Sequence, residues 1–342
     1  SEGTLAVVTE ATVSLEAIPA TKSVALLTYD DVVTAVSDVE AVLEHDAAAV
    51  ELIDDVLLEL ARDTEEFRDV VDLLPADTGS VLLVEFYADD DAAGERKVAD
   101  LIADRAPGVE TASEPTREFD ADRTLRAHDA LEAHEQERRD AFWKMRKAGL
   151  PILLSRTTDE KHVSFIEDCA VPPEHLAEYV EGFQEILEAH DTFASFYAHA
   201  GPGVLHVRPL VNVKAGDGVA DMASIADAVT DLVVEYGGSV SGEHGDGRAR
   251  SRWNRKLYGD DLWASFRELK SAYDPDWLLN PGQVCGFDDG EDRGDAPERA
   301  RAVDMTEHHR YGPDYDFEAG FEPTPSWGKD KGLGGEGGAL TG

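Results

Sequence analysis

The chain alternates short apolar segments of strand period with longer segments of helix period, and it does so twice. The first pass runs from Lys22 to Tyr87 and the second from Val163 to Tyr236. Because strand side chains repeat every two residues and helical faces about every 3.6, this alternation predicts helices packed on one sheet. The expected strands are 23–27, 49–53, 81–87, 163–168, 193–199 and 204–213, and the expected helices are 31–44, 172–190 and 219–236.

Two passes of this kind, the second containing an antiparallel hairpin, predict an α+β fold. We expect a ferredoxin-like antiparallel sheet covered by helices, in a doubled arrangement. A further long helix is expected to carry Phe142, Trp143 and Arg146 and to stop at Gly149 to Pro151. The chain opens at Ser1 without an initiator methionine and runs into an apolar segment, 5–8, which we interpret as a strand from the middle of a longer protein.

Charge limits the partners of this chain. It has 72 acidic and 31 basic residues, for a formal net charge of −41, so nucleic acid and anionic membrane surfaces are not expected to bind it. The acidic residues are spread over the whole chain, which is typical of a protein from a salt-adapted cell, although an acidic protein of an ordinary cytoplasm is the alternative.

Cysteine content and hydropathy indicate a cytoplasmic protein. Cys169 and Cys285 are far apart and form no CxxC motif, so neither a disulfide framework nor a cysteine metal site is encoded. No apolar run approaches the roughly 20 residues of a membrane helix, so no direct membrane insertion is expected. Residues 286–342 are rich in Asp, Glu, Gly and Pro and are interpreted as a linker or docking tail.

The hairpin 197–208 carries two histidines that could share a metal ion. A turn centred on Pro202 and Gly203 would set His199 directly opposite His206, with Cβ atoms roughly 5 Å apart. Two facing imidazoles make half of a metal site. His206 shares its strand face with Arg208, away from the apolar face, and a pair of surface histidines is the alternative interpretation.

The segment 241–248, Ser-Gly-Glu-His-Gly-Asp-Gly-Arg, supplies further candidates. Its three glycines allow backbone conformations in which the adjacent Glu243 and His244 need not point apart. Glu243 can then be a carboxylate ligand beside the histidine pair, and His244 a proton acceptor; a plain turn or a phosphate cradle is the alternative. Arg146, Arg208 and Arg248 are candidates for clamping a substrate carboxylate, although an arginine on a helix is commonly a surface charge or an ion-pair partner.

Three separated motifs carry a family resemblance: His199 to His206, Ser241 to Gly247, and Asp274-Pro-Asp-Trp-Leu-Leu-Asn-Pro-Gly282. Together they resemble the C-terminal domain of FAD-linked oxidases of the vanillyl-alcohol oxidase type. The family includes D-lactate dehydrogenases, glycolate oxidase flavoprotein subunits and D-2-hydroxyglutarate dehydrogenases. Residues 1–10 resemble the last flavin-contacting segment of its PCMH-type FAD-binding domain, so the expected domains are 1–20, the end of the FAD-binding domain; 21–285, the substrate and catalytic domain; and 286–342, the tail.

The resemblance implies roles for individual residues. A divalent metal, zinc or manganese, would be bound by His199, His206 and Glu243. His244 would be the base, and Arg146 would pair with the substrate carboxylate. Four residues would lie near FAD: Gly3, Thr4, Val8 and Asn280. Arg208 and Ile166 depart from the family pattern, in which many relatives have Asn and Lys at these positions, and this leaves the substrate open.

The resemblance implies a haloarchaeal-like flavoprotein that oxidises a D-2-hydroxy acid to the 2-oxo acid. D-Lactate is the first candidate substrate, and glycolate and D-2-hydroxyglutarate are the alternatives. An iron–sulfur module or subunit is the expected electron acceptor, and contact with a membrane would go through such a partner. Two further alternatives stay open: a metal-dependent hydrolase, and a substrate-binding or docking module that is inactive as a fragment.

Overall fold

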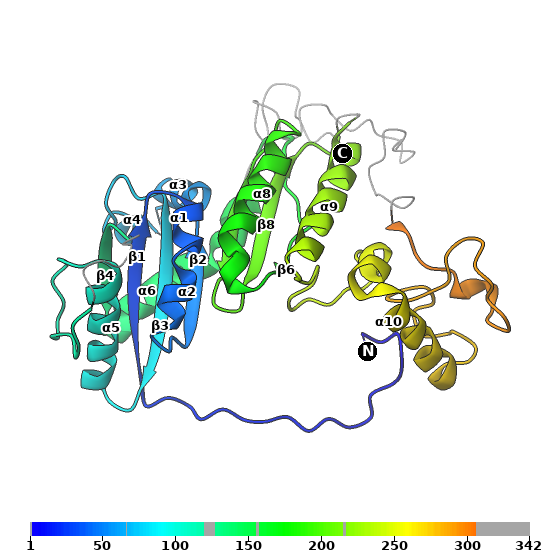
Figure 1. The fold of residues 1–342 in the computed structure, drawn as a ribbon. Coiled ribbons are helices and arrows are strands. Elements are labelled where there is room, and N and C mark those ends of the chain that lie inside the picture. The colour runs from blue at the N-terminus through cyan, green and yellow to red at the C-terminus, as the bar shows by residue number, and fades with distance from the viewer. Residues whose placement is uncertain (1, 66, 120–126, 155–156, 215–216, 306–342) are drawn as a thin grey trace, which may run out of the picture.

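A single antiparallel sheet runs through the computed structural model, which describes residues 2–65, 67–119, 127–154, 157–214 and 217–305 (Figure 1). The strand order is β4-β1-β3-β2-β7-β8-β5, and β6 also pairs with β8. The strands are β1 (Thr21–Tyr29), β2 (Ala49–Ile53), β3 (Ser80–Ala88), β4 (Asp129–Ala133), β5 (Lys161–His162), β6 (Cys169–Ala170), β7 (Ala194–His199) and β8 (Val204–Val211).

The sheet consists of two ferredoxin-like halves joined edge to edge. In the first half the order β4-β1-β3-β2 is that of a βαββαβ unit. The second half repeats this order. Its β8 pairs with β7 on one side and with β6 on the other, and β6 in turn forms an isolated bridge to Ser239. Antiparallel pairing of β2 with β7 joins the halves, with Glu51 opposite His199. The predicted doubled ferredoxin-like sheet is confirmed.

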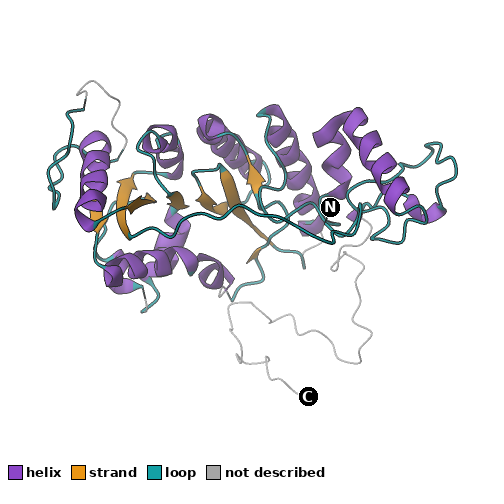
Figure 2. Cartoon of the chain, turned by 90° about the horizontal axis from the view of Figure 1, so that it is seen from below, coloured by secondary structure: helices purple, strands orange, loops and turns teal. Residues whose placement is uncertain are grey.

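Helices lie on both sides of the sheet (Figure 2). One apolar core covers the whole length of one face, under α1 (Val32–Val36), α2 (Val39–Leu43), α5 (Asp91–Arg105), α8 (Leu176–Glu188) and α9 (Gly218–Glu235). The second core covers the other face mainly in the first half, under α3 (Asp55–Arg62), α4 (Arg68–Val71), α6 (Gln136–Lys147) and α7 (Gly149–Leu154). On this second face β8 contributes no residue to the apolar core and carries His206 and Arg208 instead.

Strand alternation explains this division. In β8, Leu205 and Val207 point into the first core and are fully buried, whereas His206 and Arg208 point to the opposite face. The polar face predicted for β8, which carries His206 and Arg208, is therefore the face that the helices of the second core do not cover. The short η1 (Pro173–His175) precedes α8, whose apolar stripe is buried; it consists of Leu176, Val180, Phe183 and Leu187.

Three expected elements differ from the structure. Residues 6–19 contain no strand, and Val7 and Val8 are exposed, because this extended segment pairs with no strand among the described residues. The expected strand 163–168 is replaced by the two-residue strands β5 and β6, and the chain bends at Asp168, where φ is 79°. The expected helix 31–44 is two short helices, since Asp38 between them forms buried contacts with Arg105 and Tyr29.

A separate small core lies beside the second half, built on α10 (Ser251–Tyr273), which is broken at Gly259. Trp263, Trp277, Cys285 and Ala300 are buried there, and η2 (Glu298–Ala300) folds back onto it. The chain start returns to this core, since the fully buried Lys270 donates from Nζ to the carbonyl oxygens of Thr4 and Leu279. The part of the expected tail that the structure describes, residues 286–305, thus contributes to a core; residues 306–342 lie outside the described residues. None of the described helices has the length and apolarity needed to cross a membrane.

Candidate active site

The two hairpin histidines lie on the same face of β7 and β8, in a register that differs from the expected one. His199 pairs with Val204, and His206 pairs with Tyr197. The turn is closed by a hydrogen bond from the Gly203 amide to the Ala200 carbonyl, so its centre lies one residue earlier than predicted. The histidines are therefore diagonal neighbours, with ring centroids 5.2 Å apart. Moving the turn centre by one residue shifts the pairing of the two strands by two residues. Because side chains alternate with a period of two, His199 and His206 stay on the same face.

Asp168 holds the glycine-rich loop against the sheet. Its buried carboxylate accepts hydrogen bonds from the backbone amides of Glu243 and His244, at 3.0 and 2.9 Å, and from the Ser241 hydroxyl at 2.8 Å. Gly245 adopts a φ of +83°, and a Cβ atom there would lie 2.7 Å from the Glu2 carboxylate. The loop therefore brings adjacent side chains, Glu243 and His244, to the histidine pair, as the glycine content predicted.

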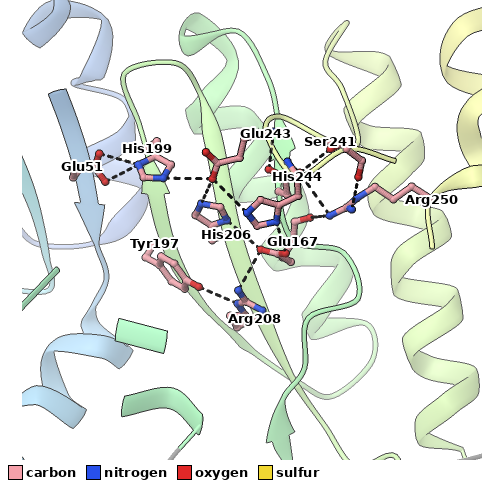
Figure 3. A network of polar contacts seen from close by, with 12 residues as sticks. Glu51, Glu167, Tyr197, His199, His206, Arg208, Ser241, Glu243, His244 and Arg250 are labelled. Carbon is pink, nitrogen blue, oxygen red and sulfur yellow. Dashed lines mark hydrogen bonds and ion pairs between the residues drawn. The ribbon is translucent and has the colours of Figure 1, made fainter. Parts of the chain in front are cut away.

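Three imidazoles converge on one carboxylate oxygen (Figure 3). Oε1 of Glu243 lies 3.1 Å from Nε2 of His206 and 3.5 Å from Nε2 of both His199 and His244. Imidazole nitrogens and a carboxylate oxygen are donors that zinc and manganese accept. The expected ligands His199, His206 and Glu243, and the expected base His244, are thus brought together.

Asp168 also lies near this cluster. One oxygen of Asp168 falls within 4.8 Å of donor atoms of His206, Glu243 and His244, a grouping that does not contain His199. The Asp168 oxygens already accept three hydrogen bonds from the loop. The Nε2 atom of His199 lies outside this grouping and points at Glu243, at 3.5 Å from its Oε1.

Two buried glutamates contact the Nδ1 atoms of the three imidazoles, on the side of each ring that faces away from Glu243. Glu51 contacts Nδ1 of His199 at 2.8 and 2.9 Å through its two oxygens. Glu167 contacts Nδ1 of His206 at 3.1 Å through one oxygen and Nδ1 of His244 at 3.0 Å through the other. Each imidazole thus has a carboxylate at Nδ1 and directs Nε2 to Glu243, an arrangement that orients metal-binding histidines in proteins.

The pKa values in the site reflect these contacts. Burial alone would raise the pKa of Glu167, but the hydrogen bond with His206 and the positive charge of Arg208 lower it to about 2. The hydrogen bond between His199 and Glu51 raises the pKa of the His199 imidazole against the effect of burial. Glu167 is therefore ionised over the whole physiological range and acts only as an acceptor.

Two of the three candidate arginines lie in the site. Arg146 and Arg208 are buried beside the Tyr197 ring, with guanidinium carbons 5.1 and 5.8 Å from its centroid. Arg146 lies 2.8 Å from Glu51, and Arg208 lies 3.2 Å from Glu167. Both guanidinium groups neutralise the glutamates that support the imidazoles.

Arg248 points elsewhere, and a neighbouring arginine organises the loop. Arg248 is exposed, and it forms no ion pair with the described residues. Arg250 instead donates to the carbonyl oxygens of Gly245 and Glu167, at 2.8 Å each. Arg250 was not among the residues expected from sequence, because alternation along a loop does not indicate which of two nearby arginines faces inward.

The residues expected near FAD divide into a cluster and an outlier. Asn280 donates from Nδ2 to the Gly3 carbonyl at 2.8 Å, and Thr4 is buried, with its carbonyl on Lys270. Val8 is exposed on the extended segment. The Glu2 carboxylate accepts from the backbone amides of Asp246 and Gly247, at 2.7 Å each, so the chain start is tied directly to the loop that carries Glu243 and His244.

Comparison with known proteins decides the family. Residues 18–284 match the family described as FAD linked oxidases, C-terminal domain. The chain belongs to this family. Within it, the chain is 32% identical over 295 residues to D-2-hydroxyglutarate dehydrogenase of Pantoea ananatis, covering 85% of this chain and 28% of that protein. It is 30% identical over 297 residues to D-lactate dehydrogenase of Anaerostipes hadrus, covering 83% of this chain and 56% of that protein.

The family fold is also seen in a solved structure. The substrate-bound crystal structure of p-cresol methylhydroxylase matches 80% of this chain and 54% of its own, with a TM-score of 0.52 and 12% identity. This likeness supports the fold of the FAD-linked oxidase C-terminal domain. The chain spans little more than a quarter of the length of the D-2-hydroxyglutarate dehydrogenases that it resembles.

Proposed function

We propose that the protein to which this chain belongs is an FAD-dependent dehydrogenase that oxidises a D-2-hydroxy acid to the 2-oxo acid. The observation that carries the proposal is the convergence of three Nε2 atoms on Glu243, with two buried arginines beside them. Such a site offers donors for a divalent cation together with positive charge for a carboxylate. Its membership of a family of FAD-linked oxidases makes FAD the expected electron acceptor within the protein.

The donor set fits zinc or manganese. His199, His206 and Glu243 supply two nitrogens and one oxygen and leave other positions open, which is the arrangement of a catalytic site. A bound cation would polarise the hydroxyl and carboxylate of the substrate, and FAD would take up the two electrons that leave its C2 carbon. Gly3, Thr4 and Asn280 are the described residues that we assign to the FAD site.

The residues of the chain perform the binding and the proton transfer. His244 is half exposed, with Nδ1 on the ionised Glu167, and its Nε2, 3.5 Å from Glu243, is the atom that would take the hydroxyl proton of the substrate. Arg146 is buried, and its Nε atom has no hydrogen-bond partner among the described residues. This unpartnered donor supports its assignment to the substrate carboxylate, with Arg208 as the second candidate.

The test uses the full-length protein with FAD. Visible absorbance of the flavin is followed while D-lactate, L-lactate, glycolate and D-2-hydroxyglutarate are added separately, before and after a chelator. We expect one of the D-acids or glycolate to bleach the flavin, and we expect a chelator to abolish this until zinc or manganese is returned. D-Lactate is our first candidate, and bleaching by D-2-hydroxyglutarate alone would replace it.

Other outcomes would refute the proposal. A flavin that no hydroxy acid reduces, or one reduced equally by both enantiomers of lactate, contradicts it. Metal-dependent hydrolysis without flavin would favour the hydrolase interpretation. The iron–sulfur electron acceptor and the cytoplasmic location stay predictions from the sequence.

A further inference from the structure

We propose that Glu2 is a positioning residue that couples the binding of FAD to the position of the loop 241–247. The assignment of the two residues that follow Glu2 to the FAD site rests on the proposed function. The contacts of Glu2 do not: its two carboxylate oxygens accept hydrogen bonds from two successive backbone amides of the loop, those of Asp246 and Gly247, at 2.7 Å each.

The loop is shaped to receive the Glu2 carboxylate. Gly247 adopts a φ of +52°, which turns the backbone so that two successive amides converge on one anion. A Cβ atom on Gly245 would lie 2.7 Å from a Glu2 oxygen, so the carboxylate lies directly against the main chain of this glycine. The glycines of the loop are therefore needed for contact with Glu2.

Two carboxylates hold the loop, each by two successive amides. Asp168, which is fully buried immediately before β6, accepts from the amides of Glu243 and His244 and ties this half of the loop to the sheet. Glu2 accepts from the two amides further along and ties the other half to the chain start. Because Glu2 is exposed, its contact is the one that can open without unfolding of the sheet.

The main chain next to Glu2 is held by the small core around α10. The Gly3 carbonyl accepts from Nδ2 of Asn280 at 2.8 Å, and the Thr4 carbonyl accepts from Nζ of Lys270 at 2.6 Å. Glu2 itself adopts a φ of 47°, which is uncommon for a residue with a Cβ atom. The side chain of one residue thus contacts the loop while the main chain of the next two contacts the small core.

Coupling follows from this arrangement. A cofactor bound to the residues that we assign to the FAD site, Gly3, Thr4 and Asn280, fixes the chain start and with it the adjacent Glu2 carboxylate. The fixed carboxylate holds the loop that carries His244, so the proposed base is ordered when the electron acceptor is present. Coupling between two sites is reciprocal, so an ordered loop also favours FAD binding.

Glutamine at position 2 removes the contact and keeps the size of the side chain. A carboxylate accepts at both oxygens, whereas Gln accepts at its oxygen and donates at its amide nitrogen. One of the two loop amides in Glu2→Gln would therefore face another donor. Because Glu2 is exposed, the variant should fold.

Hydrogen–deuterium exchange of the full-length protein, with FAD and after removal of FAD, is the first measurement. Mass spectrometry of fragments covering 241–250 reports on the loop amides. In the wild type we expect FAD to slow exchange of the Asp246 and Gly247 amides by about 5–150-fold, the usual range of coupling between two sites. In FAD-bound Glu2→Gln we expect exchange about 10–100-fold faster than in the wild type, as for loss of a hydrogen bond to a charged acceptor, and no effect of FAD.

Glu16→Gln is the matched control. It makes the same change of charge on the extended segment that follows the chain start, and Glu16 is exposed. Its loop should exchange as in the wild type and respond to FAD in the same way. A wild-type loop that does not respond to FAD would overturn the proposal, as would a full response in Glu2→Gln or an equal loss of the response in Glu16→Gln.

The second measurement separates positioning from a general loss of structure. In Glu2→Gln we expect kcat for the hydroxy acid to fall by about 10²-fold, the cost of misplacing a reacting group by about 1 Å. KM should change much less, because Arg146 and Arg208, the candidates for the substrate carboxylate, lie on α6 and β8 and not on the loop. A raised KM with unchanged kcat would contradict the positioning of His244.

A second variant and the choice of readout keep the two proposals apart. Glu2→Ala removes both acceptors without placing a donor against the loop, and it should lose the FAD response in the same way. A loop that responds to FAD in a wild type that oxidises no hydroxy acid would refute the proposed function and leave the role of Glu2 intact. Oxidation of a D-acid by a protein whose loop ignores FAD would refute the role of Glu2 alone.

Discussion

Nε2 of His206 lies 3.1 Å from Oε1 of Glu243, although one residue belongs to β8 and the other to a loop that follows α9. The contact depends on Asp168, whose carboxylate holds the loop by two backbone amides. A strand thus supplies a rigid nitrogen donor, and a loop pinned to the same sheet supplies the oxygen donor. Precision of this kind is what a metal site requires.

His206→Ala should abolish specific zinc binding. His206 is the most buried of the three imidazoles and the closest to Glu243, so its loss removes a direct donor. The loss should exceed the ~10–100-fold cost of removing an indirect partner of a metal ligand. Zinc affinity from chelator competition is the measurement. His190→Ala is the control, because His190 contacts Ile186 and Ser224 outside the site; an equal effect of both substitutions would argue against a metal site here.

His244→Ala should lower turnover of the D-2-hydroxy acid substrate and leave the zinc content unchanged. Removing a general base costs about 10²–10⁴-fold in rate. Stopped-flow reduction of the flavin, together with zinc analysis of the same sample, measures both quantities. Because the ring is half exposed, added imidazole should restore part of the rate. If zinc is lost together with activity, His244 is a metal ligand and not the base.

Lys270→Met should destabilise the small core around Trp263 and Trp277. Lys270 is fully buried, and besides two carbonyl oxygens it contacts the Asp274 carboxylate at 2.9 Å. Burial would raise the pKa of Asp274, but backbone amides of Leu278 and Leu279 and the Lys270 ammonium lower it to about 2. Breaking a buried ion pair on one side costs about 3–5 kcal/mol.

Denaturant unfolding measures the change in the free energy of unfolding caused by Lys270→Met. Lys256→Met on the same helix is the control. Lys256 pairs with Asp231 near the surface, where such a pair contributes about 1 kcal/mol or less. A similar decrease in the free energy of unfolding for the two variants would show that the buried contacts of Lys270 do not stabilise the small core.

Asp54 should make the stability of the fold fall as pH rises. Burial raises the pKa of Asp54 to about 7, although the backbone amides of Phe196 and Leu57 and the Ser195 hydroxyl all donate to it. An unfolded aspartate titrates near its usual pKa of about 3.9. Between these two values the folded state holds the extra proton, so the free energy of unfolding decreases with rising pH and levels off above about 7.

The expected decrease is on the order of 4 kcal/mol, from about three pKa units at about 1.4 kcal/mol each. Asp54→Asn cannot titrate, so its free energy of unfolding should lack this part of the pH dependence even though the substitution is itself destabilising. Denaturant unfolding at pH values from 5 to 8 compares the two slopes. Parallel slopes would mean that Asp54 is ionised throughout.

The residues missed in sequence analysis share a physical property. Glu51 and Glu167 are acidic residues next to or inside strands, and they are buried because a partner is supplied by another part of the sheet. A charged residue within the apolar segment 49–53 was a usable signal, since a buried charge needs a partner. The identity of that partner could not be predicted, because Glu51 meets His199 only where the two halves of the sheet join.

Sequence alone determined the features that depend on neighbours along the chain. The periods of the apolar residues predicted the doubled α+β fold, strand parity predicted the polar face with His206 and Arg208, and the glycines predicted that Glu243 and His244 could act together. Tertiary structure decided the turn centre of the hairpin, the bend at Asp168 and the two supporting glutamates. Periodicity reports which way a side chain points, because rotation per residue is local. Which side chain it meets depends on strand register and on pairing between distant segments, and those are set by packing of the whole sheet.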